Sequence, residues 1–170
     1  HHWLAAGLRY SDSIEQSHCS HVMRSTSALV SWAEGEWDRA VTESSQAMAD
    51  RGCRRASEFA RHVMGYEAMG RGDLAEAEAI LKPALELGES SELIEMILPS
   101  LWGLAEVALQ SGDPVRAFAL AEDALARAVA MGERLQAGVH RLAEKHRCIG
   151  DVRGLGLMVG LEFVKDRATR

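Results

Sequence analysis

Cysteine and long apolar runs are the first things that this sequence lacks. Its only cysteines among 170 residues are Cys19, Cys53 and Cys148, and no two of them form a CxxC pair. A secreted scaffold held together by disulfides is therefore excluded, and the scattered thiols predict a reducing, cytoplasmic location. No apolar run approaches the roughly 18 residues that a membrane-spanning helix needs, and no signal-peptide pattern opens the chain, so we expect no membrane partner.

Positive charge is also scarce. The chain has 19 Lys and Arg against 25 Asp and Glu, a net charge of −6. This balance argues against direct nucleic-acid binding, because phosphates are recognised by clustered Lys and Arg. The charge is uneven, since residues 1–134 carry 12 basic and 21 acidic side chains (net −9), whereas residues 135–170 carry 7 and 4 (net +3). We therefore expect a first domain at 1–134 and a C-terminal appendage at 135–170.

What the sequence does have is a repeated spacing of small residues. It occurs in GEWDRAVTESSQA (35–47), GDLAEAEAILKPA (72–84) and GDPVRAFALAEDA (112–124), each with Ala five and twelve positions after the Gly. A Gly in the left-handed region ends one helix, the acidic residue beside it caps the next, and alanines seven apart share one helix face. The spacing predicts stacked helix–turn–helix units at about 20–52, 56–90 and 93–133, within an all-α solenoid of antiparallel helix pairs.

The expected helices follow from the same spacing. Pro83 and Pro99 fall inside two of them and could interrupt them. We expect helices at about residues 3–15, 20–33, 36–50, 56–70, 73–87, 93–110 and 114–131.

The repeat resembles the tetratricopeptide repeat. The longer words GLRYSDSIEQS, WAEGEWDRAV and MGRGDLAEAEAIL resemble the helical-repeat region of large ATP-binding LuxR-type bacterial transcriptional regulators. The resemblance implies a non-catalytic protein–protein interaction module, with a small-ligand sensor as an alternative. The chain has neither the GxxxxGK[ST] nucleotide loop nor the basic recognition helix of that family.

In the tetratricopeptide arrangement, the first helix of each unit lines a concave groove. Such a groove would suit a protein or peptide partner, and a homo-oligomer is also possible. The alternative is that its aromatic rings fill the core between helices. Aligned on the glycines, the face includes Val22 and Ser25, and the candidate partner-binding residues on it are Trp32, Phe59, His62, Tyr66, Met69, Trp102 and Glu106.

A compact group of possible metal ligands lies near the start of the chain. His18, Cys19 and His21 supply only part of a tetrahedral site, so Cys53 or His62 would have to complete it. Polar residues at a helix start explain the group better, and we predict no metal site.

The end of the chain has a different texture. Glycines interrupt an apolar run in GDVRGLGLMVGLEFVKDRATR (150–170), which indicates strand rather than helix. LAEKHRCIGDVRGLGLMVGLEFVKDRATR (142–170) is similar to a stretch near the C-terminus of class III, pyridoxal-phosphate-dependent aminotransferases of the 4-aminobutyrate group. The resemblance implies a helix followed by a strand of their small C-terminal domain, joined to the repeats near residues 132–137.

The aminotransferase chemistry needs a lysine that forms a Schiff base with the cofactor. The only lysines are Lys82, Lys145 and Lys165, and none lies in a context like that of the family's cofactor lysine. We therefore predict no catalytic residue, no cofactor and no enzyme activity, with an inactive aminotransferase fragment as the alternative. A natural fusion, a chimeric gene assembly and a deliberate fusion remain alternatives for the join.

Overall fold

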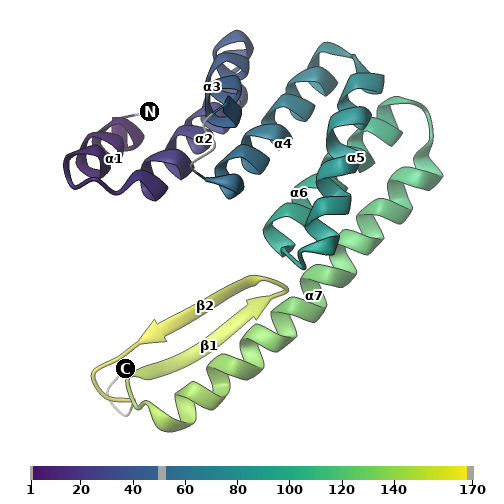
Figure 1. Ribbon diagram of the computed structural model, residues 1–170. Coiled ribbons are helices and arrows are strands. Elements are labelled where there is room, and N and C mark those ends of the chain that lie inside the picture. The colour runs from purple at the N-terminus through teal and green to yellow at the C-terminus, as the bar shows by residue number, and fades with distance from the viewer. Residues whose placement is uncertain (1, 50–52, 168–170) are drawn as a thin grey trace. The chain divides into compact units, whose positions relative to one another are not determined.

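The computed structural model describes residues 2–49 and 53–167, and the chain divides into two compact units, His1–Leu120 and Ala121–Arg170. Residues 50–52, where the first predicted repeat unit ends, lie outside the described residues. The described elements are α1 (His2–Ser13), α2 (Ser17–Ala33), α3 (Trp37–Ala49), α4 (Arg54–Arg71), α5 (Leu74–Ser90), α6 (Ile94–Gln110), α7 (Pro114–Lys145), β1 (Ile149–Leu155) and β2 (Met158–Phe163) (Figure 1).

The prediction of an all-α stack of helix pairs with a small C-terminal appendage is confirmed. In the first unit each helix packs against the next one along the chain, and α4 also contacts α2 and α6 (Figure 1). Gly35, Gly72 and Gly112 have φ values of 82°, 85° and 79°, as their predicted role in left-handed turns requires. Asp73 and Asp113 cap the following helices, because their carboxylates accept hydrogen bonds from the backbone N–H groups three residues later.

Small residues bring the helices of the first unit into close contact. Ala28, Ala40 and Ala77 are fully buried, and a Cβ added to Gly65 would lie 2.7 Å from the side chain of Leu81. Ala28 and Ala40 pack together with Val63, whereas the main core cluster consists of Tyr66, Ala68, Met69, Ala77, Leu81, Leu104 and Val107.

The two prolines do not break their helices. Pro83 lies inside α5 and Pro99 inside α6, and both helices continue through them. The carbonyl oxygen of Pro99 accepts a hydrogen bond from the hydroxyl of Tyr66 at 2.9 Å, which ties α6 to α4 at this point.

In the second unit a β-hairpin lies along α7 (Figure 1). The strands are antiparallel and Leu155 pairs with Met158, so the turn is the dipeptide Gly156–Leu157, with Gly156 at φ 55°. A Cβ on Gly132 of α7 would lie 2.0 Å from the carbonyl oxygen of Gly156, so helix and turn touch through their backbones. The single strand expected in this region is therefore folded into two strands.

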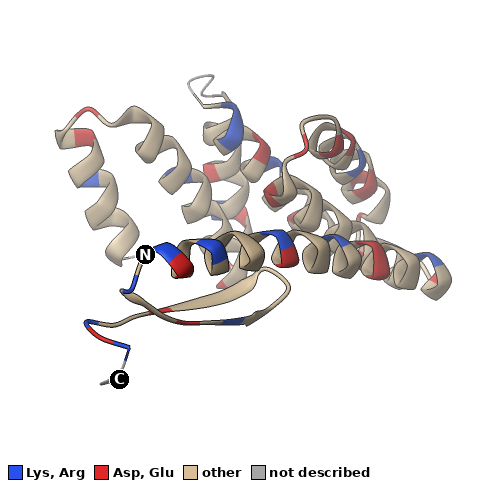
Figure 2. Cartoon of the chain, turned by 90° about the horizontal axis from the view of Figure 1, so that it is seen from below, with Lys and Arg blue, Asp and Glu red and all other residues tan. Residues whose placement is uncertain are grey.

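Helix α7 extends well beyond the predicted end at residue 131. Arg167 connects the end of this helix to β1, because its guanidinium donates to the carbonyl oxygens of Ala143 in α7, of His146 just after it at 3.2 Å and of Ile149 in β1 at 2.9 Å. Acidic and basic residues are interspersed along α7 (Figure 2). The compact units divide within this helix, whereas the boundary near residue 134 rests on composition and stays a prediction about sequence origin.

None of the helices in residues 2–49 and 53–167 is both long and apolar enough to cross a membrane.

Candidate functional site

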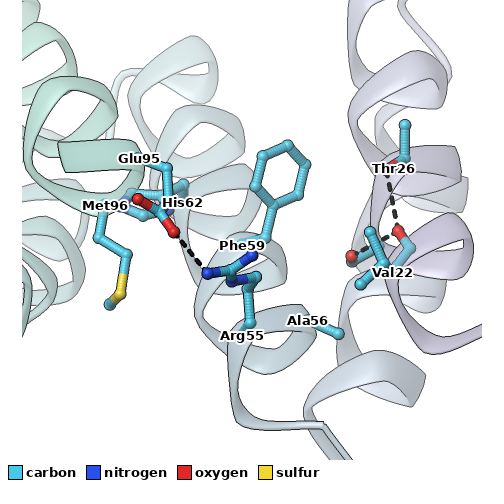
Figure 3. A pocket seen from close by; sticks show the side chains of 9 residues that line it. Val22, Thr26, Arg55, Ala56, Phe59, His62, Glu95 and Met96 are labelled. Atoms are coloured by element: carbon cyan, nitrogen blue, oxygen red, sulfur yellow. Dashed lines mark hydrogen bonds and ion pairs between the residues drawn. The ribbon is translucent and has the colours of Figure 1, made fainter. Parts of the chain in front are cut away.

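A pocket of about 260 Å³ opens in the first unit between α2, α4 and α6 (Figure 3). Helix α4 contributes one face to it, because positions 55, 59 and 62 are spaced at about one helical turn. Helix α2 supplies one opposing wall, and the first turn of α6 supplies the other. The lining residues are Val22, Ser25, Thr26, Arg55, Ala56, Phe59, His62, Glu95 and Met96.

The charged groups at the pocket neutralise each other. Arg55 and Glu95 form an ion pair with an N–O distance of 2.7 Å, and both side chains are substantially exposed (Figure 3). An exposed pair of this kind contributes at most about 1 kcal/mol to stability, because solvent screens it. The remaining walls are mainly apolar, with Phe59 and Met96 the largest side chains among them.

His62 is the buried polar group of the pocket, with only 3% of its surface exposed. Its Nε2 lies 2.8 Å from the hydroxyl oxygen of Ser100, and Ser100 is 2.9 Å from the carbonyl oxygen of Met96. The backbone carbonyl groups of Met96 and Glu58 also face the imidazole as hydrogen-bond acceptors. Nδ1 is shielded from solvent within the part of the chain that the structure describes.

Burial keeps this imidazole neutral. The pKa of His62 is lowered from 6.5 to about 4, mainly by burial and to a smaller extent by the nearby charge of Arg61, while the backbone carbonyl groups of Met96 and Glu58 oppose part of the shift. Near neutral pH the imidazole of His62 is therefore uncharged.

The predicted groove residues lie in three different environments. Phe59 and His62 line the pocket, whereas Tyr66 and Met69 are buried in the core cluster and Glu106 is half-buried on α6. None of these placements tests a partner, so the partner-binding groove stays a prediction.

The two tryptophans of that set meet at a tyrosine. The ring centroid of Tyr66 is 5.4 Å from that of Trp32 and 4.8 Å from that of Trp102, the latter in an edge-to-face arrangement. Trp32 is half-buried and its indole N–H has no hydrogen-bond partner among the described residues, while Trp102 is 43% exposed.

Sequence reasoning missed the ion pair at the pocket. Arg55 lies before residue 56, where the second unit was predicted to begin, but α4 already starts at Arg54. Glu95 lies in the first turn of α6, where an acidic residue is expected for the helix dipole alone. An acidic and a basic residue at the starts of two first helices could have suggested the contact.

The possible metal ligands do not converge. The sulfur of Cys53 lies 3.4 Å from Nδ1 of His18, which is a hydrogen-bond contact rather than a shared ligand position. Among the described residues no three His, Cys, Asp or Glu side chains are placed to hold a metal ion.

The second unit does not fit pyridoxal phosphate, the cofactor that the resemblance of the C-terminal segment implies. A Schiff-base lysine needs a pocket with an acidic partner and donors for a phosphate group. Lys145 and Lys165 are exposed in this unit, as is Lys82 in the first unit. Arg153 of β1 is paired with Asp151 of its own strand at 2.7 Å.

The comparisons with known proteins agree with the resemblance of the C-terminal segment. The chain is 55% identical over 49 residues to the hypotaurine/taurine–pyruvate aminotransferase of Paracoccus denitrificans, covering 29% of this chain and 11% of that enzyme. It is 39% identical over 89 residues to the 5-aminovalerate aminotransferase of Pseudomonas aeruginosa, covering 48% of this chain and 20% of that enzyme. It is also 49% identical over 49 residues to an ethanolamine-phosphate phospho-lyase homologue of Caenorhabditis elegans, covering 29% of this chain and 10% of that protein.

The chain thus spans about a tenth to a fifth of the length of these relatives. No family model matches the chain, and no solved structure matches it significantly. Part of the chain is therefore similar to class III aminotransferases. Nothing in the comparisons bears on the tetratricopeptide or LuxR resemblance of the remainder.

The prediction that this protein is not an enzyme is wrong. Its matched relatives are aminotransferases and a phospho-lyase homologue, which indicates an origin in an enzyme family. The lack of a suitable lysine did not exclude an enzyme, because a segment that covers about a tenth of an enzyme need not contain its cofactor lysine.

Proposed function

We propose that the unit Ala121–Arg170 is the C-terminal helix–hairpin element of a class III, pyridoxal-phosphate-dependent aminotransferase. The observation that carries the proposal is the identity of 55% over 49 residues with a taurine–pyruvate aminotransferase. The matched length is close to the 50 residues of the compact unit.

The exposed apolar surface of this unit supports the same proposal. Leu155 and Met158 are more than 80% exposed and Phe163 is 72% exposed, whereas Val139 and Ile149 are the large apolar side chains that the unit buries. A two-stranded hairpin on one helix buries too little surface to be stable on its own, so such an element needs further protein around it. The body of an aminotransferase would provide that cover.

For the whole protein we propose amino-group transfer. The amines after which two of the relatives are named, taurine and 5-aminovalerate, both carry a primary amine at one end and an acidic group at the other. The proposed donor class is accordingly an amine of this kind, with a 2-oxo acid such as pyruvate as the acceptor. The helix–hairpin unit of this chain would shape the small domain, and another part of the enzyme would bind the cofactor. The three free cysteines fit a cytoplasmic enzyme of this kind.

A transplant tests the proposal directly. Residues 121–170 would replace the matched segment of the Paracoccus enzyme, and taurine–pyruvate transamination would be measured with the cofactor bound. We expect a folded, active chimera, because half or more of the matched residues are already identical.

The control graft takes the matched segment of the Bilophila wadsworthia taurine–pyruvate aminotransferase, which is 53% identical to this chain over 49 residues. An active control together with an unfolded or inactive chimera would overturn the proposal. A second control carries Gly132→Leu in the graft, and it should lose activity because the helix can no longer touch the hairpin turn.

The first unit has a second proposed role, the binding of a protein or peptide. The observation that favours it is the 43% exposed ring of Trp102, which is held edge-on by the buried Tyr66. A peptide would be selected from a library for binding that quenches the tryptophan fluorescence of the protein. Trp102→Ala should leave the fold intact and weaken the binding of this peptide. A selection that yields no peptide sensitive to this substitution would refute the role.

A further inference from the structure

One face of α6 presents an exposed aromatic ring, a carboxylate and an exposed leucine in a row. Trp102, Glu106 and Leu109 follow one another at spacings of four and three residues, so they lie on the same side of the helix. Trp102 is 43% exposed and Leu109 is 55% exposed, while Glu106 between them is half-buried. These three residues, which we call the α6 stripe, place apolar contact area on both sides of one negative charge.

The ring of Trp102 is held by two rings from the neighbouring helices. Its centroid lies 4.8 Å from that of Tyr66 on α4 and 6.4 Å from that of Trp32 on α2, and both contacts are edge-to-face. The hydroxyl of Tyr66 in turn donates to the carbonyl oxygen of Pro99 at 2.9 Å. A ring that is fixed in this way loses little conformational freedom when a partner binds, so it suits the role of an anchor.

The carboxylate of Glu106 has no cation beside it. It forms no ion pair or hydrogen bond with the residues that the structure describes. Arg71 and Arg116 do not serve it, because each is already paired with carboxylates on other helices of the first unit. Glu106 is therefore free to attract a cation that a partner supplies.

The overall charge of the first unit favours the same kind of partner. Residues 1–120 carry 10 basic and 18 acidic side chains, a net charge of −8. A field of this sign attracts cationic partners and repels acidic ones. An acidic peptide or a nucleic acid is therefore disfavoured at the α6 stripe, and a basic protein segment is favoured.

We propose that the α6 stripe binds a basic protein segment through an arginine, whose guanidinium stacks on the ring of Trp102 and pairs with Glu106. The inference rests on the peptide-binding role proposed above for the first unit, and it names the chemistry of the partner. Arginine fits this surface better than lysine, because its planar guanidinium stacks on an indole and donates two hydrogen bonds to one carboxylate. Leu109 provides an apolar contact for a neighbouring side chain of the segment.

Peptides selected from a random library for binding to the full chain are the probes for this site. Those that bind Trp102→Ala more weakly are retained, and each is synthesised with its arginines intact and with citrulline in their place. Citrulline has nearly the same shape as arginine but no charge, and affinities would be measured by isothermal titration calorimetry. We expect arginine to be enriched in the retained peptides, and the citrulline versions to bind about 5-fold more weakly.

Two substitutions in α6 separate the ion pair from the stacking contact. Glu106→Gln should reduce the preference for arginine over citrulline to below about 2-fold, because the charge that selects the guanidinium is gone. The matched control is Glu86→Gln, which removes the same charge from an exposed position on α5 and should leave the preference unchanged. Trp102→Leu keeps an apolar side chain without a ring, and it should also reduce the preference.

The outcomes separate this inference from the role on which it rests. If no selected peptide depends on Trp102, both the peptide-binding role and the arginine site are wrong. If the peptides depend on Trp102 but bind equally well with citrulline, or if the arginine preference persists in Glu106→Gln, the role stands and the arginine site is refuted. Circular dichroism establishes that each variant is folded before binding is measured. If Trp102→Leu does not fold, Glu106→Gln still decides the question.

Discussion

Acidification should destabilise the first unit through His62. Its side chain is 3% exposed and its ring packs 6.4 Å from that of Tyr66, so protonation would place a charge in an apolar setting. Above pH 6.5 the imidazole is neutral in both the folded and the unfolded chain, and it makes no pH-dependent contribution. Between pH 6.5 and about 4 the unfolded chain takes up a proton that the folded chain does not, so the free energy of unfolding decreases as the pH decreases.

The magnitude follows from the displacement of the pKa. A shift from 6.5 to about 4 corresponds to about 3 kcal/mol, at roughly 1.4 kcal/mol for each pH unit. This is a large part of the 5–15 kcal/mol that is typical for a folded domain, so the effect should be easy to detect.

Tryptophan fluorescence is a suitable assay, because all four tryptophans lie in the first unit and residues 121–170 contain none. Urea unfolding would be recorded from pH 7.5 to 4.5 for the unsubstituted protein and for His62→Phe, which has no imidazole to protonate at this position. The difference between the two free energies cancels the other titrating groups. It should be flat above pH 7 and change by about 2.5 kcal/mol by pH 4.5 in favour of the variant, because that pH is still above the folded pKa of about 4. A difference that stays constant across this range would show that burial does not keep His62 neutral.

Three further predictions concern packing. Ala77→Leu should cost about 1–3 kcal/mol of unfolding free energy in urea melts, because Ala77 is fully buried in the core cluster, whereas Ala75→Leu on the exposed face should cost under about 0.5 kcal/mol. Gly132→Leu should release the hairpin from α7 and collapse the amide NMR dispersion of the strands, while Gly138→Ala, whose new Cβ meets only an arginine tip at 3.9 Å, should preserve it. Arg167→Gln should lower the free energy of local opening by about 1 kcal/mol, because the guanidinium binds the carbonyl oxygen of Ala143 in the last turn of α7, and amide exchange in that turn should become faster. Unchanged exchange there would show that water replaces the guanidinium.

The repeat spacing predicted most of the first unit because its signals are local. A glycine with positive φ at 35, 72 and 112 and an acidic cap at 73 and 113 each act within one turn of a helix. The alanines five positions after Gly35 and Gly72, at 40 and 77, belong to the predicted spacing, and they are fully buried. Ala117 belongs to the same pattern but is only half-buried, because the first unit ends at Leu120 and no further helix pair covers it.

The pocket was predicted only in part, because its key contacts join distant segments. The positions of Phe59 and His62 on one face of α4 follow from helical periodicity. The partner of His62 is Ser100, 38 residues away on α6, and no local pattern specifies that pair.

The hairpin was not predicted from the sequence either. Glycines at 154 and 156 were interpreted as interruptions of one strand, although a two-residue turn with Gly at positive φ is what reverses the chain there. The backbone contact between Gly132 and Gly156 spans 24 positions, and it explains why a glycine is tolerated inside a long helix.

That contact also bears on where the aminotransferase-like element begins. The composition of the chain changes at residue 135, but the hairpin turn packs on Gly132 and lies 3.5 Å from the carbonyl oxygen of Ala128, measured from a Cβ built on Gly156. A segment that starts at 135 would leave the turn without the helix surface it packs against. The transplant into an aminotransferase should therefore succeed when it begins at residue 121 and fail when it begins at 135, although the shorter graft contains the whole glycine-rich run. Equal activity of the two chimeras would show that the host enzyme supplies the same helix surface and that residues 121–134 contribute only length.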